Sequence, residues 1–147
     1  MPTLVVLEKM TSSGGHDMKA LPANVLEHFR TALETSAKLA VRLHREGGLV
    51  GIGTDFPVDG VPVGESVHRE LELLVQLGGA TPLEALQMAT LSSARILGFD
   101  ALLGTVEPGR LAHLVVLKKN PIEDISNVRS IRYVIHDGRL HEPGSTE

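Results

Sequence analysis

The chain has 147 residues, a formal net charge of -4 and a hydrophobic content of 42%, which suits one domain with its own core. The acidic balance, the 3% aromatic content and the lack of a dense Lys/Arg patch argue against nucleic-acid binding. No apolar run approaches the roughly 20 residues of a membrane-spanning helix, so we expect no membrane contact.

The sequence contains no cysteine, which excludes a disulfide framework and thiolate ligation of a metal. Any metal ion would be held by histidine and carboxylate side chains, and seven histidines are present. The first residues lack the basic and apolar regions of a signal peptide. We therefore expect a cytoplasmic location.

Residues 2–7 form a short apolar run that predicts a buried strand. A buried strand without a polar lead-in suggests that further sequence once preceded it. The Ser-, Gly- and Lys-rich residues 11–22 predict a loop containing His16 and Asp17. These two side chains either line a site or, as is commoner for loop residues, face solvent.

A long amphipathic helix is predicted from an N-cap at Asn24 to the break at Gly47 and Gly48. Residues 48–57, GLVGIGTDFP, then predict a second buried strand that ends at Asp55. Helices on both sides of this strand indicate an α/β fold, in which catalytic groups lie at the carboxyl ends of strands. An aspartate after a strand is also a common helix cap or turn residue, so both interpretations of Asp55 stay open.

Residues 65–77 predict a second amphipathic helix, with Glu72 on its outer face. His68 and Glu70 lie two residues apart, on different faces of that helix, so they do not form a metal motif. Thr81, Pro82 and Glu84 have the spacing of a capping box with proline in the first turn. The helix that they begin is expected to continue to Leu97 and to stop at Gly98.

From Gly104 the apolar period changes from 3.6 to 2, which predicts a three-stranded meander over residues 111–117, 131–136 and 139–141. His113, His136 and His141 lie on or beside these strands. Their spacing in the sequence matches no compact ligand motif, so we expect exposed strand histidines.

Taken together, several short motifs resemble the C-terminal portion of the metal-dependent amidohydrolase superfamily, in its imidazolonepropionase-like and prolidase-like branch. They are PTL at 2–4, which is similar to a late barrel strand, GTD at 53–55, TPLEAL at 81–86 with AT at 89–90 and Ala94, LGTVEPGR at 103–110, LVVL at 114–117, NP at 120–121 and VIHDGR at 134–139. Their order and spacing together make the resemblance specific. One departure is His113, where the family usually has an aspartate before Leu-Val-Val.

The resemblance implies an eight-stranded β/α barrel with one or two divalent metals, usually zinc, and a small β-sandwich. Residues 1–101 would be the last two strand–helix units of this TIM-like (β/α)8 barrel, left incomplete, and residues 102–147 an antiparallel β-sandwich segment. Asp55 matches the family's last-strand aspartate, which binds the metal and takes the proton of the attacking water. The implied reaction hydrolyses an amide, peptide or cyclic C–N bond of a small-molecule or peptide-like substrate.

The family's other metal ligands, a His-x-His pair, a lysine or glutamate and two further histidines, have no counterpart in this sequence. A catalytic zinc normally takes about three protein ligands. We therefore expect the C-terminal fragment of such a hydrolase, inactive by itself and lacking its N-terminal part. The alternatives are a non-catalytic interaction module that forms a homo-oligomer, and one half of a split hydrolase.

Overall fold

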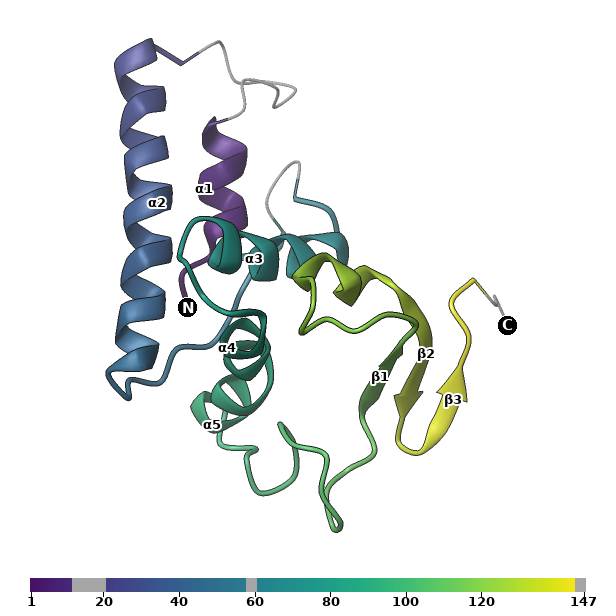
Figure 1. The fold of residues 1–147 in the computed structure, drawn as a ribbon. Helices are drawn as coiled ribbons and strands as arrows, with labels where there is room; N and C mark the ends of the chain where they lie inside the picture. Colours follow the sequence, from purple (N-terminus) through teal and green to yellow (C-terminus); the bar gives the residue numbers. More distant parts are fainter. Residues whose placement is uncertain (12–20, 58–60, 145–147) are drawn as a thin grey trace.

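The computed structural model describes residues 1–11, 21–57 and 61–144. Helices gather on one side of the molecule and a small sheet lies on the other (Figure 1). The elements are α1 (Leu4–Thr11), α2 (Ala23–Arg45), α3 (Glu65–Gln76), α4 (Pro82–Gln87), a π-helical turn η1 (Met88–Ser92), α5 (Ser93–Ile96), β1 (Leu114–Leu117), a 3-10 turn η2 (Ile125–Arg129), β2 (Ile131–His136) and β3 (Arg139–His141). None of the described helices has both the length and the apolar character needed to cross a bilayer.

The predicted strand over residues 2–7 is wrong, because most of that segment is the first helix, α1. A short apolar run fits a buried helix as well as a buried strand, and its period alone cannot separate the two. The helix buries Leu4 and Val5 against its neighbours, and its first backbone N–H groups find an acceptor on α3. The N–H groups of Leu4 and Val5 are therefore satisfied without any partner strand.

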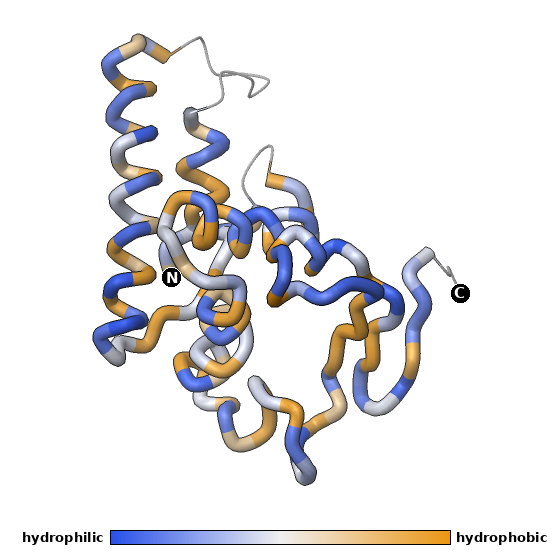
Figure 2. The backbone as a smooth tube through the Cα atoms, viewed as in Figure 1, coloured by the Kyte–Doolittle hydropathy of each residue, from blue (hydrophilic) through white to orange (hydrophobic). Residues whose placement is uncertain are grey.

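The long helix is confirmed as α2, which packs beside α1. Leu33, Ala37, Ala40 and Val41 recur at helical spacing and form its buried stripe. Figure 2 shows apolar and polar residues alternating along α2, as expected for a helix with one buried face. The helix begins after Pro22 rather than at Asn24, and Gly47, with a φ of 87°, lets the chain leave it.

The second predicted strand, residues 48–57, is also absent as a regular element, and no described residue before Leu114 forms a strand. The two predicted strand–helix units are thus present as helices without paired strands. Residues 49–54 run as an extended, unpaired segment over the helical core, with Val50 buried. A strand needs neighbours for its backbone hydrogen bonds, and the described residues supply none there.

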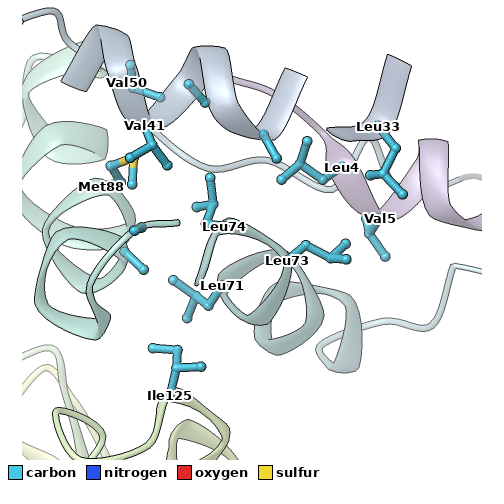
Figure 3. Packing of buried hydrophobic residues seen from close by; sticks show 14 of the residues in the cluster. Leu4, Val5, Leu33, Val41, Val50, Leu71, Leu73, Leu74, Met88 and Ile125 are labelled. Atoms are coloured by element: carbon cyan, nitrogen blue, oxygen red, sulfur yellow. The ribbon is translucent and has the colours of Figure 1, made fainter. Parts of the chain in front are cut away.

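The hydrophobic core lies where α1, α2, α3 and α4 meet, and its side chains are aliphatic (Figure 3). Leu4, Leu73, Leu74 and Met88 are almost completely buried. Ile125 from η2 joins the same cluster, so the connection between β1 and β2 is packed against α3. The sheet region is thereby attached to the helical core through η2.

The predicted meander is confirmed as an antiparallel sheet in the order β1-β2-β3. Leu114 pairs with Ile135 and Val116 with Tyr133, before the register shifts between Val116 and Leu117. Asp137, with a φ of 48°, and the glycine after it make the tight turn from β2 into β3.

The capping box predicted at the start of α4 is also confirmed. The Thr81 Oγ1 accepts the Glu84 backbone N–H at 3.2 Å, and the Glu84 carboxylate accepts the Thr81 backbone N–H at 2.7 Å. Arg45 at the end of α2 donates to the same carboxylate at 2.7 Å and 2.9 Å. These bonds, with Arg45 as the largest cause, lower the pKa of Glu84 to about 2.

Replacing Thr81 by alanine should lower the free energy of unfolding by about 1 kcal/mol, because the cap side chain is lost. Thr90 offers a matched control, since its exposed hydroxyl bonds only to the Leu86 carbonyl within the same helical stretch. Urea unfolding of Thr81→Ala and Thr90→Ala measures the difference. Equal stability of the two variants would contradict the role of the cap.

Candidate functional site

The segment that leads to Asp55 is fixed by close packing against the η1–α5 helical stretch. The Ile52 N–H donates to Ser93 Oγ at 3.3 Å, and Ser93 Oγ donates to the Met88 carbonyl at 2.8 Å. Met88 is the first residue of the π-helical turn η1, so this bond links the segment to that turn. A Cβ atom on Gly51 would lie 2.8 Å from Ser93 Oγ and 3.0 Å from Ile96 Cδ1, so the glycine permits the contact.

Asp55 lies at the end of this segment, with an exposed side chain and a φ of 53°. Aspartate is one of the few residues that adopt this left-handed conformation, because its short side chain can bond locally. Two residues earlier, Gly53 is covered by the Met1 side chain, which would lie 3.3 Å from a Cβ atom placed there. The carboxylate is therefore carried by a packed segment and is itself open to solvent.

The other loop residues singled out from the sequence, His16 and Asp17, lie outside the described residues. Among the residues that the structure does describe, Asp55 belongs to no group of three or more His, Asp or Glu side chains able to share a metal ion. The backbone at Asp55 is thus well defined, but the described residues place no set of metal-binding side chains beside it.

We expect Gly51→Ala to lower the free energy of unfolding by about 1–3 kcal/mol, because the added methyl group would be forced into Ser93 and Ile96. Gly53→Ala is the matched control, since its methyl group would meet only the flexible Met1 side chain. Denaturant unfolding of both variants tests this packing. A Gly51→Ala protein as stable as Gly53→Ala would show that the segment is not held against α5.

Glu70 is a buried acidic residue whose role the sequence did not reveal. Its side chain is 0% exposed, and its two oxygens each accept one backbone N–H from the first turn of α1, from Leu4 and from Val5, both at 2.9 Å. The carboxylate therefore caps the N-terminus of a helix that is 66 positions away in sequence. Burial raises the pKa of Glu70 to about 7, although both hydrogen bonds favour the charged form.

The position of Glu70 did carry a signal. It precedes Leu73 and Leu74 by three and four residues, which places it on the buried face of α3. An acidic residue within an apolar stripe indicates a buried acceptor role.

Ion pairs surround this contact on its outer side. Arg69 donates to Glu8 at 2.9 Å and to Glu72 at 3.0 Å, and Arg129 donates to Glu72 at 2.6 Å and also pairs with Glu65. The prediction that Glu72 faces solvent is wrong, because only 8% of this residue is exposed. Its charge is compensated by two guanidinium groups, which makes the burial possible. The network ties α1, α3 and η2 together beside a cavity of about 470 Å³.

The raised pKa of Glu70 predicts a pH dependence of stability. Because the folded protein holds this proton more tightly than the unfolded chain, the free energy of unfolding should fall as pH rises from about 4.5 to 7. The shift corresponds to at most about 3 kcal/mol. Glu70→Gln should lose this part of the slope, whereas Glu27→Gln, on the exposed face of α2, should keep it. Parallel pH profiles for wild type and Glu70→Gln would contradict the assignment.

A second group of chemically active side chains lies at the end of the sheet. His113 precedes β1, while His136 ends β2 and Asp137 follows it. The two imidazole rings stack with centroids 4.6 Å apart, and the Asp137 carboxylate lies 3.3 Å from His113 Nε2 and 3.8 Å from His136 Nε2. The expectation of exposed strand histidines is confirmed for His136 and His141 and is wrong for His113, which is only partly exposed. The sequence could not give the pairing, because the register of β1 on β2 depends on the long connection between them.

Comparison with known proteins assigns most of the chain to one family model. The model of the Amidohydrolase family matches residues 9–141. N-acetylgalactosamine-6-phosphate deacetylase from Escherichia coli O157:H7 is 46% identical over 52 residues, which are 35% of this chain and 14% of that protein. Ochratoxinase from Aspergillus niger is 33% identical over 93 residues, 63% of this chain and 18% of that protein.

Solved structures match almost the whole chain. A Bifidobacterium longum protein provisionally described as a prolidase has a TM-score of 0.81 at 35% identity, covering 99% of this chain and 36% of that one. A Xaa-Pro dipeptidase with methionine bound in its active site has a TM-score of 0.77 at 30% identity, covering 97% of this chain and 34% of that one. The chain thus spans no more than 36% of the length of these relatives.

Proposed function

Because this chain belongs to the amidohydrolase family, we propose that it contributes to the hydrolysis of carbon–nitrogen bonds. The observation that carries the proposal is the family match over residues 9–141. The relatives include an N-acetyl sugar deacetylase and a dipeptidase, and both names describe the breaking of an amide bond. A small amide or a peptide-like molecule is the corresponding substrate class.

Asp55 is the residue that we assign to this chemistry. A carboxylate can accept the proton of a water molecule as that water attacks a carbonyl carbon. Three features of Asp55 support the role: its exposed side chain, its place at the end of a packed segment and its left-handed backbone. Unusual backbone conformations cluster at functional sites, where the surrounding packing maintains them.

A divalent metal such as zinc, which the family resemblance implies, does not fit the described residues around Asp55. One carboxylate provides a single ligand, whereas a catalytic zinc takes about three protein ligands. Asp55 shares no group of three suitable side chains within the described ranges. No step of the chemistry is therefore assigned to a metal held by this chain alone, and we propose that the chain is inactive by itself.

We further propose that the remaining groups of the site come from polypeptide outside these 147 residues. An open apolar groove of about 380 Å³ supports this, since it lies between α2 and the residues around Val50. Leu39, Leu43 and Leu49 line the groove, and each is at least 44% exposed. Exposed apolar surface of this kind usually packs against further protein. Residues 1–101 would then be part of a barrel, and the rest of that barrel would cover the groove. Residues 102–147 would be the β-sandwich segment.

Transplanting this chain in place of the matching third of the Xaa-Pro dipeptidase tests the proposal. The chimera should hydrolyse an Xaa-Pro dipeptide, and Asp55→Asn should lower kcat by at least about 100-fold, the usual contribution of a general base. Asp100→Asn, an exposed aspartate beyond α5, is the matched control and should leave kcat unchanged.

Two results would contradict these assignments. A folded, active chimera that is indifferent to Asp55→Asn would remove Asp55 from the chemistry. Turnover by the 147-residue chain alone, abolished by Asp55→Asn, would show that no further polypeptide is needed.

A further inference from the structure

The turn at the end of β2 holds two imidazoles and one carboxylate in a fixed arrangement. One residue beyond the pairing of Leu114 with Ile135, the rings of His113 and His136 stack on one another. The Asp137 N–H donates to His113 Nδ1 at 3.3 Å, so the turn residue is bonded back to the first strand. Two neighbouring strands and one tight turn, seen at the lower end of the sheet in Figure 1, therefore bring the three residues together.

The separations of the possible ligand atoms are close to those of a metal site. One nitrogen or oxygen from each residue lies within 4.8 Å of the others. Oδ1 of Asp137 lies 3.3 Å from His113 Nε2, and Oδ2, the other oxygen of the same carboxylate, lies 3.8 Å from His136 Nε2. Bonds of about 2.0–2.2 Å to zinc put neighbouring ligand atoms about 3.3–3.6 Å apart.

We propose that His113, His136 and Asp137 form a surface site for a divalent transition-metal ion of the zinc type. Two imidazoles and one carboxylate suit Zn²⁺, Ni²⁺ or Cu²⁺, whereas Mg²⁺ and Ca²⁺ prefer oxygen ligands. The site lies in the sheet region and contains no part of the Asp55 segment. It is thus independent of the proposed hydrolytic function.

Two neighbouring features limit the affinity of this site. A metal on His113 Nε2 requires the proton on Nδ1, so binding breaks the long bond from the Asp137 N–H. Arg139 pairs with His136 across β2 and β3, and its positive charge opposes a bound cation. The side chains of His136 and Asp137 are each 68% exposed, so water completes the coordination shell. We therefore expect weaker binding than at a closed four-ligand zinc site.

Calorimetric titration of the full 147-residue chain with Zn²⁺ at pH 7.5 tests the site. One ion should bind, and His113→Asn or His136→Asn should each weaken binding at least about 10-fold, because each removes a ligand of the ion. His141→Asn on β3 and Asp55→Asn are the matched controls and should bind as the wild type does. Mg²⁺ should produce no saturable binding.

Proton NMR of the histidine side chains in the unmutated chain gives a second measurement that does not depend on the folding of a variant. Zn²⁺ should shift the His113 and His136 signals together, at the concentrations that the calorimetry reports. Unchanged Zn²⁺ binding in both histidine variants, loss of binding in Asp55→Asn, or shifts confined to other histidines would each overturn the proposal.

Discussion

The buried carboxylate of Glu70 is the constraint on which the arrangement of the N-terminal half depends. It accepts the backbone N–H groups of Leu4 and Val5, which begin α1 and would otherwise lack acceptors in the protein interior. A buried polar group of this kind is stable only while its hydrogen bonds are made. The contact therefore fixes where α1 starts on α3, and the aliphatic side chains of the core fill the space around that point.

The position of the proposed catalytic residue follows from the same contact. With α1 held at its first turn, Met1 and Pro2 extend over the segment that carries Asp55, and Met1 covers Gly53. Ser93 holds the other side of that segment through Ile52. The segment before Asp55 is thus packed from two directions, while the apolar groove along Leu49 and Val50 remains open to further protein. The group of His113, His136 and Asp137 lies in the sheet region and is organised by strand pairing and by the turn after β2.

Structure that depends on residues close together in the sequence was predictable, and contacts between residues far apart in the sequence were not. The capping box at Thr81, the long helix α2 and the three-stranded meander follow from short patterns whose physics is complete within a few residues. The prediction of two barrel strands was wrong. A strand needs a neighbouring strand for its backbone hydrogen bonds, and the described residues provide none at these segments. Asp55 could be selected as a candidate from its place after an apolar run. The role of Glu70 depends on a helix far away in sequence, and the His113–His136 pair on a register that no local pattern encodes.

Amide hydrogen exchange at Leu4 and Val5, followed residue by residue by NMR, tests most directly whether Glu70 fixes the N-terminal helix. These amides belong to the first turn of a helix near the chain end, where unbonded N–H groups exchange rapidly. If Glu70 accepts both, they should be protected to the same degree as the core amides of Leu73 and Leu74 in α3. Rapid exchange at Leu4 and Val5 while α3 remains protected would contradict this arrangement of the N-terminal half.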